Sequence, residues 1–244
     1  MTRTAFITGA TAGIGEAAAR KFAGDGWHVI GTGRRADRLD RLAAELGNAF
    51  RPLELDMQET AAFDRIAAEV GPVDLLLNNA GLAPPMSNLQ DADQSPIDIV
   101  VDTNIAGLVA LTRAMLPGLI TRKGAVINLS SVAATYPYRG GAVYAGSKAF
   151  VRQFSLGLRC DLAGTGVRVT SIEPGMVETE FTLVRTGGDQ AASDALYAGA
   201  NPMTADDIAD TIFYVATLPR HLNINALELM PVTQSWAGFA VERI

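Results

Sequence analysis

Thr8-Gly-Ala-Thr-Ala-Gly-Ile-Gly15 is the stretch that decides the fold. A short apolar run, residues 4–8, leads into it, and a helical pattern over residues 16–24 follows it. A strand, a glycine turn and a helix in this order form the context in which chains bind dinucleotides. The glycines permit a tight turn, and the N-terminus of the helix offers N–H groups to a pyrophosphate. The stretch predicts a nucleotide site, although a merely Gly-rich turn would have the same spacing.

Apolar runs and helical patterns alternate along the rest of the chain. The expected strands cover residues 4–8, 27–32, 50–55, 73–77, 125–129, 167–172 and 224–229. The expected helices cover residues 16–24, 36–46, 58–70, 97–122 (bent near Asn104 and Gly107), 142–163 and 204–217, the last capped by Thr204. No linker, repeat or low-complexity segment interrupts the pattern. We therefore predict one α/β domain, residues 1–244: a Rossmann-type, doubly wound parallel sheet of about seven strands with helices on both faces.

The composition narrows the class of protein. Of 244 residues, 48% are hydrophobic and 19% charged, which is sufficient for one sizeable core. The net charge of −6 argues against a nucleic-acid partner. A single Cys160 excludes an internal disulfide and fits a reducing compartment. With no signal-peptide pattern and no apolar run of about 20 residues, we expect a cytoplasmic protein without a membrane partner.

The end of the second strand selects the cofactor. A carboxylate there would bind ribose hydroxyls, whereas arginines accommodate a 2′-phosphate. The chain reads Gly33-Arg34-Arg35, with no acid before Asp37, so we predict NADP in preference to NAD. The alternative is an ordinary basic helix entry, continued by Arg38 and Arg41.

Two further turns follow strand ends. Asp56, with Met57 after it, could accept a bond from the adenine amino group, or it could cap the helix expected at residues 58–70. Asn78-Asn-Ala-Gly81 is a turn of small residues where the backbone could pass close to a ribose.

Tyr144 and Lys148 are candidates for the chemistry. Residues four apart share one helix face, and a nearby cation lowers the pKa of a phenol. Ser131, thirteen residues upstream, offers a hydroxyl to the oxygen whose proton Tyr144 would transfer. Asn104 is polar within an apolar stretch, which indicates either a functional amide or one satisfied by the backbone. Taken alone, the Tyr–Lys spacing also fits a solvated helix face.

These motifs together resemble the short-chain dehydrogenase/reductase family. Residues 8–15 match T-G-x-x-x-G-x-G, residues 78–81 match N-N-A-G, and Pro174-Gly175 matches the P-G turn. The Asn–Ser–Tyr–Lys tetrad is met by Asn104, Ser131, Tyr144 and Lys148. Within the family, residues 31–35, 136–138, 150–155 and 230–235 resemble the NADP-dependent 3-hydroxy acid dehydrogenases, which act on serine, allo-threonine and malonic semialdehyde.

The resemblance implies hydride transfer between NADP(H) and a small hydroxy acid, with the tetrad as catalytic residues and no metal. It implies that the cofactor contacts Gly9, Thr11, Ala12, Gly13, Ile14, Gly15, Arg34, Arg35, Asp56, Met57, Asn79, Ala80, Gly81, Tyr144, Lys148, Pro174, Gly175, Val177 and Thr179. In these roles Ser131 binds the substrate oxygen, Tyr144 transfers its proton, Lys148 lowers the phenol pKa and binds the nicotinamide ribose, and Asn104 holds a relay water.

A polar, Gly-rich segment at about residues 178–202 is the predicted substrate lid. It departs from the form expected of the family between residues 178 and 194. Its cation Arg185 is our candidate to hold the substrate carboxylate beside Ser131, unless it is a solvated lid residue. Arg139, which stands where the family pattern has a small residue, is the competitor at the opposite rim.

Three other functions remain compatible with the fold. A catalytically silent dinucleotide sensor would be expected to lack the Tyr or the Lys. A 3-oxoacyl reductase acting on an acidic carrier protein would need a basic patch, but residues 151–161 supply only Arg152 and Arg159. A general carbonyl, sugar or steroid reductase would need an apolar lid.

The helix of Tyr144 also predicts assembly. Phe150, Phe154, Leu158 and Leu162 lie on its other face, and an exposed apolar stripe marks a partner surface. By resemblance we expect a homotetramer with Cys160 near an interface. The alternative is burial of the stripe within the monomer.

Overall fold

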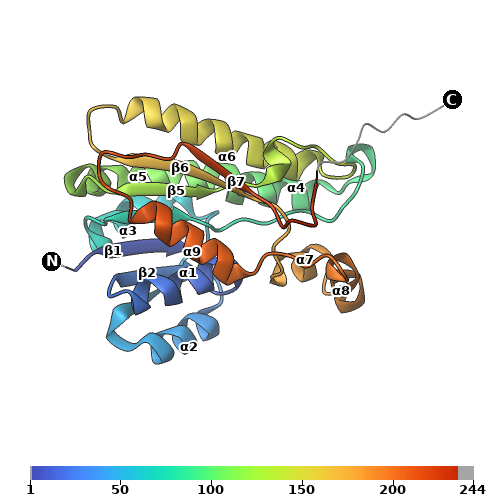
Figure 1. Ribbon diagram of the computed structural model, residues 1–244, viewed down its shortest axis with the longest axis horizontal. Coiled ribbons are helices and arrows are strands. Elements are labelled where there is room, and N and C mark those ends of the chain that lie inside the picture. Colours follow the sequence, from blue (N-terminus) through green and yellow to red (C-terminus); the bar gives the residue numbers. More distant parts are fainter. Residues whose placement is uncertain (1, 236–244) are drawn as a thin grey trace.

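Seven parallel strands form the centre of the computed structural model, which describes residues 2–235 (Figure 1). They are β1 (Thr4–Thr8), β2 (His28–Gly33), β3 (Phe50–Glu54), β4 (Leu75–Asn78), β5 (Ala125–Leu129), β6 (Arg168–Pro174) and β7 (Ala226–Leu229). Their order in the sheet is β3-β2-β1-β4-β5-β6-β7, so the direction of winding reverses between β1 and β4. The predicted doubly wound fold is confirmed.

Helices cover both faces of the sheet, as Figure 1 shows. They are α1 (Gly13–Gly24), α2 (Ala36–Leu46), α3 (Phe63–Val70), α4 (Gln94–Val101), α5 (Leu108–Arg122), α6 (Ala142–Asp161), α7 (Glu180–Arg185), α8 (Gln190–Tyr197) and α9 (Ala205–Ala216). One core joins the sheet to α1, α2 and α9, and the other joins it to α3, α5 and α6. Because neighbouring residues of a strand point to opposite faces, Phe6 and Leu76 enter one core while Ile7 and Leu77 enter the other.

Most element boundaries follow the sequence pattern. The strands at residues 4–8 and 125–129 and the helix at 36–46 coincide with the prediction. Thr204 caps α9, and a capping box with Asp207 completes this N-terminus.

Two segments differ from the prediction. The helix expected from residue 58 begins only at Phe63, after a 3₁₀ turn at Thr60–Ala62, because the Asp56 carboxylate accepts from Gln58 N at 3.0 Å and holds a turn there. The helix expected from residue 97 begins earlier, at Gln94 with α4, and a 3₁₀ turn at Leu89–Asp91 precedes it.

The bend predicted near Asn104 and Gly107 is present. A π-helical turn, Asp102–Gly107, lies between α4 and α5, and turns of this kind are frequent at functional sites. Gly107 is needed there because a Cβ on it would collide with the carbonyl oxygen of Met57.

The continuous helix Gln94–Arg122 is long and apolar enough, by length and composition, to cross a membrane. Its buried side chains pack against α3 and the sheet; they include Leu108, Leu111, Met115 and Leu119. Core helices commonly pass the same test, and these contacts are those of a core helix.

The segments around the carboxyl ends of the strands complete the fold. The predicted lid contains two short helices, α7 and α8, which project beyond those ends in Figure 1. The segment that follows β7 is described as far as Ser235. In it, Gln234 Oε1 accepts from Met176 N at 2.7 Å, which joins this segment to the turn after β6.

Candidate active site

The turns after β1 and β4 are bonded to each other at the point where the winding reverses. Thr8 Oγ1 donates to Leu77 O at 3.2 Å and accepts from the backbone N–H groups of Asn79 and Ala80, both at 2.9 Å. The Asn79 amide donates to Thr8 O at 2.8 Å and to Gly9 O at 3.3 Å. In doubly wound sheets the ligand binds in the crevice at this point.

The glycine turn fits a pyrophosphate. Gly9 has φ +70°, a conformation that side chains disfavour, and a Cβ on Gly15 would collide with Gly9 O and the Asn79 amide. The backbone N–H groups at the start of α1 therefore stand in a narrow cradle that only glycine leaves open, the arrangement that binds phosphates at helix N-termini. The sequence predicted this role for residues 9–15.

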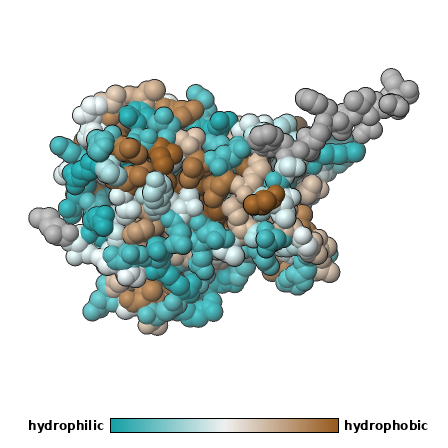
Figure 2. Space-filling view, viewed as in Figure 1, coloured by the Kyte–Doolittle hydropathy of each residue, from teal (hydrophilic) through white to brown (hydrophobic). Residues whose placement is uncertain are grey.

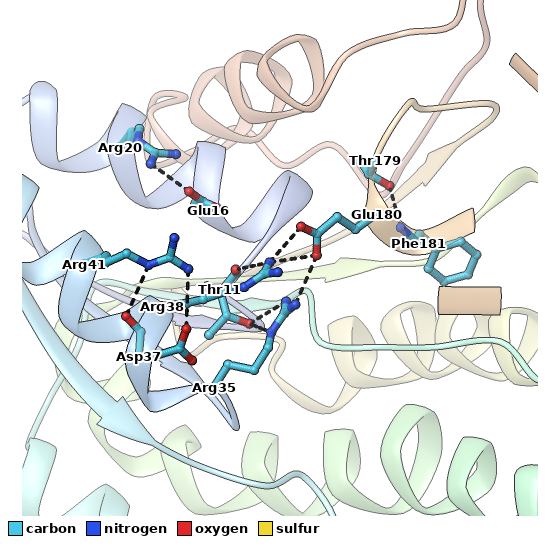
Figure 3. A network of polar contacts seen from close by, with 10 residues as sticks. All are labelled: Thr11, Glu16, Arg20, Arg35, Asp37, Arg38, Arg41, Thr179, Glu180 and Phe181. Carbon is cyan, nitrogen blue, oxygen red and sulfur yellow. Dashed lines mark hydrogen bonds and ion pairs between the residues drawn. The ribbon is translucent and has the colours of Figure 1, made fainter. Parts of the chain in front are cut away.

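Arginines surround the glycine turn at Thr11 (Figure 3). Arg35 donates to Thr11 Oγ1 from Nε at 3.2 Å and from Nη2 at 3.0 Å, while Arg38 Nη1 lies 3.4 Å from Thr11 O. Both also bind the carboxylate of Glu180, the first residue of α7. Guanidiniums beside the glycine turn suit the 2′-phosphate of NADP in charge and geometry.

The sequence argument missed part of this cluster. Arg38 was assigned only to the alternative of a basic helix entry, yet it lies one turn after Arg35 on the same helix face, and that spacing is a signal. Arg34, predicted alongside Arg35, is more exposed, and its Nη1 lies 3.8 Å from Asp56 Oδ2. The predicted adenine contact of Asp56 and the neighbouring Met57 stays a prediction.

Residues 174–179 carry the chain from β6 to α7 past the same crevice. Ser131 Oγ donates to Pro174 O at 3.4 Å. At the other end, a Cβ on Gly13 would lie 3.3 Å from the Thr179 side chain. The predicted P-G turn thus lies between the glycine turn and Ser131.

Ser131 and Tyr144 are brought together by the end of β5 and the start of α6. A hydrogen bond links their side chains, and Ser131 Oγ also accepts from Ala133 N at 3.1 Å. The neighbouring Ser130 is buried, and its hydroxyl donates to Lys148 O at 2.7 Å. Ser131 is therefore the serine that faces the tyrosine, as predicted.

Burial sets the charge state of Tyr144 and Lys148. Burial raises the pKa of Tyr144 to about 12, although the hydrogen bond with Ser131 and the charge of Arg185 act to lower it. Burial also lowers the pKa of Lys148 to about 8, and its Nζ donates to Leu129 O at 2.7 Å. Among the protein's own groups, desolvation is the largest influence on the phenol, and the Lys148 ammonium lies 5.7 Å from the ring centroid. The lowering of the phenol pKa by Lys148 stays a prediction.

The Asn104 amide is fully bonded within the π turn. It accepts from Leu82 N at 3.0 Å and donates to Leu82 O at 2.9 Å and to Ser147 Oγ at 3.0 Å. These bonds match the alternative in which the Asn104 amide is satisfied largely by the backbone. A Cβ on Gly81 would lie 3.3 Å from Asn104 Oδ1 and 3.4 Å from Lys148 Nζ, so both groups border the space beside this glycine. The relay through Asn104 stays a prediction.

The lid helix α7 lies over the tyrosine. The Phe181 ring centroid is 5.6 Å from that of Tyr144, and the Arg185 guanidinium carbon is 5.8 Å from the same ring. Arg185 Nη2 donates to Tyr138 OH at 3.0 Å, and its buried Nε has no hydrogen-bond partner within residues 2–235. A buried guanidinium N–H without an acceptor is suited to binding an anion.

Arg139, the competing cation, lies elsewhere. It is exposed, and its Nε lies 3.5 Å from Asn88 Oδ1. Near this rim a cavity of about 180 Å³ is lined by the loop of residues 84–97 and by Gly140, Ala142 and Val143 at the start of α6.

Known proteins resemble the chain over its whole length. A family model described as short chain dehydrogenase matches residues 3–187. Serine 3-dehydrogenase of Agrobacterium fabrum is 60% identical, covering 100% of this chain and 99% of that protein. Sulfoacetaldehyde reductase 2 of Chromohalobacter salexigens is 54% identical, covering 100% of both. A solved closed form of serine dehydrogenase complexed with NADP⁺ is 47% identical with a TM-score of 0.96, covering 99% of this chain and 100% of that one.

The lowered pKa of Lys148 predicts a pH dependence of stability. Lysine titrates near 10.5 in the unfolded chain but at about 8 in the folded one, so between these values the unfolded state binds more protons. The free energy of unfolding should therefore rise with pH in this window, by at most about 1.4 kcal/mol per pH unit, and Lys148→Met should abolish that rise. Urea denaturation of both proteins from pH 7 to 10.5 measures the difference. Parallel curves would contradict a lowered pKa.

Proposed function

Because the chain belongs to the short-chain dehydrogenase family, we propose that it transfers a hydride between NADP(H) and a small 3-hydroxy acid, with serine as the first candidate. The observation that carries the proposal is the position of Arg185, a cation without a carboxylate partner in residues 2–235, over Tyr144 and Ser131. Relatives at 60% and 54% identity are named for serine and for sulfoacetaldehyde, both small molecules, one carrying a carboxylate and the other a sulfonate.

The residues of the crevice fit NADP. The glycine turn and the start of α1 would hold the pyrophosphate, the arginines at Thr11 the 2′-phosphate, and Lys148 the ribose beside the nicotinamide. When bound, NADP⁺ supplies the hydride acceptor, and NADPH the donor.

The four residues of the tetrad would transfer the proton of the substrate hydroxyl. Ser131 would donate a hydrogen bond to the substrate oxygen, and Tyr144 would take the hydroxyl proton during oxidation or return it during reduction. A phenol with a pKa of about 12 is a poor base at neutral pH, so it needs positive charge close to it during the reaction. Lys148, buried behind the tyrosine, is the residue that would provide part of that charge in its protonated form. A water between Lys148 and Asn104, beside Gly81, would pass the proton toward solvent.

Arg185 would recognise the acid group of the substrate. Its guanidinium can bind a carboxylate through two parallel N–H···O bonds, and α7 would then close over the substrate as part of the lid at residues 178–202. A sulfonate carries a similar set of oxygens. Reduction of sulfoacetaldehyde is therefore the second candidate, favoured by the relative that bears this name.

We also propose that the protein is a cytoplasmic homotetramer, although the surface that supports this assembly differs from the predicted one. The predicted apolar stripe of α6 is divided: Leu158 and Leu162 are buried in the monomer, whereas Phe150 stacks on Phe154 and remains 36% exposed. Cys160 is exposed.

A second surface supports the assembly. Strand β7 is a free edge of the sheet, and Figure 2 shows hydrophobic side chains gathered around it in the middle of the view. Tyr214, Leu222 and Val232, which flank this strand in the sequence, are all exposed. An apolar edge of this kind needs a covering partner.

Turnover should depend on the Tyr144 hydroxyl. Tyr144→Phe removes the proton-transferring oxygen and leaves the ring in place, so we expect kcat for serine with NADP⁺ to fall by at least about 100-fold while the Kd for NADPH stays within about twofold. Stopped-flow assays and fluorescence titration measure the two quantities. Assays of serine and 3-hydroxypropionate with NADP⁺ or NAD⁺, and of sulfoacetaldehyde with NADPH or NADH, test the proposed function. It fails if none of these substrates reacts.

Arg185 should distinguish acids from neutral alcohols. Arg185→Ala should lower kcat/KM for a hydroxy acid by about 100-fold, because a bidentate ion pair is lost, and leave the low activity toward the matching uncharged alcohol nearly unchanged. Arg139→Ala is the matched control. Equal losses with both substrates would reduce Arg185 to a support of the lid, and a loss confined to Arg139→Ala would transfer the role to that residue.

Light scattering should report four chains of 25.7 kDa each. If the edge beside β7 and Phe150 face partner subunits, charged substitutions at the exposed Val232 and Phe150 should each lower the measured mass. A mass of one chain across the micromolar range would exclude the tetramer.

A further inference from the structure

Glu180, the first residue of α7, lies in the arginine cluster that follows β2. Its carboxylate is 3.1 Å from Arg35 Nη1, and its two oxygens are 2.8 and 2.7 Å from Arg38 Nη1. Figure 3 shows the three side chains converging beside Thr11, between the start of α2 and the start of α7. An acidic residue of the lid therefore supplies the anion at the place where the two arginines meet the glycine turn.

The carboxylate is held in its charged form. The hydrogen bonds from Arg38 lower the pKa of Glu180, and those from Arg35 act in the same direction. A phosphate group offers the same guanidiniums a second anion with more charge and more oxygens. Two anions repel each other at this distance, so the carboxylate and a phosphate compete for the arginines.

We propose that Glu180 competes with the 2′-phosphate of NADP for Arg35 and Arg38, so that NADP releases α7 from the start of α2 whereas NAD leaves it tied. The inference rests on the proposed use of NADP. Glu180 acts here as a positioning residue for the lid and as a determinant of cofactor discrimination, since it weakens the binding only of cofactors that carry a 2′-phosphate.

The consequence reaches the active tyrosine through α7 itself. This helix has six residues, Glu180–Arg185, and spans only about 9 Å. Its first residue binds the arginines, its second, Phe181, packs on Tyr144, and its last, Arg185, lies over the same ring. Thr179 caps the helix, and its side chain lies close to the glycine turn, where a Cβ on Gly13 would be 3.3 Å from it. Occupation of the 2′-phosphate site is thereby linked to the residues that cover the substrate site.

Adenosine 2′,5′-bisphosphate and 5′-AMP both lack the nicotinamide and differ only in the 2′-phosphate, so comparing them isolates the effect of that phosphate. Glu180→Gln keeps the shape and removes the charge, so it should tighten binding of adenosine 2′,5′-bisphosphate by about tenfold and change that of 5′-AMP by less than twofold in calorimetric titrations. The control is Glu178→Gln, which changes the net charge equally on a residue that makes no ion pair within residues 2–235. It should leave both ligands unaffected. In an Arg38→Gln background the effect of Glu180→Gln should shrink to about twofold or less.

Hydrogen exchange tests the release of the helix without turnover. Adenosine 2′,5′-bisphosphate should speed exchange in residues 180–188 of the wild type, 5′-AMP should not, and Glu180→Gln should exchange fast without any ligand. If Glu180→Gln binds the bisphosphate as weakly as the wild type does, or more weakly, or if the bisphosphate slows exchange at these residues, the competition is refuted. If the wild type itself fails to prefer the bisphosphate to 5′-AMP, the proposed use of NADP fails instead.

Discussion

The hydrogen bonds between Thr8 and Asn79 are the constraint on which the site depends. They join the ends of β1 and β4, the two strands between which the winding of the sheet reverses. Because Thr8 is buried and Asn79 half-buried, breaking this contact would leave polar groups unsatisfied away from water. The glycine turn is thereby held open on one side and the Ala80-Gly81 turn on the other. The crevice for the cofactor exists because two loops far apart in sequence share these bonds.

Burial shifts the pKa values of Tyr144 and Lys148, both on α6, in opposite directions. It disfavours the phenolate of Tyr144 and the ammonium of Lys148, so both groups are driven toward their neutral forms in the folded protein. At neutral pH the Tyr144 phenol therefore stays neutral, whereas Lys148, with a pKa of about 8, is still largely protonated. Both side chains therefore lie in a site of low polarity. An added positive charge has a large effect there, because electrostatic interactions are stronger where water is excluded.

Helix α7 is the structural link between recognition of the cofactor and cover of the substrate site. Six residues connect the arginines of the glycine turn to the ring of Tyr144. The sequence identified this region only as a polar lid. Its acidic first residue and its aromatic second residue carried no recognisable signal there, because their partners, Arg38 and Tyr144, lie 142 and 37 residues earlier in the chain.

Local sequence determined the seven strands, the glycine turn and the bend at Asn104, and it predicted the tetrad, because apolar periodicity, glycine spacing and helix-face geometry act over a few residues. Tertiary structure alone decided which side chains are buried and which charged groups form ion pairs. Desolvation raises the pKa of Tyr144, and packing buried Leu158 and Leu162 while leaving Phe150 exposed. It also paired Arg35 and Arg38 with Glu180. Burial and long-range ion pairs depend on the position of the whole chain in space, so no local pattern could have predicted them.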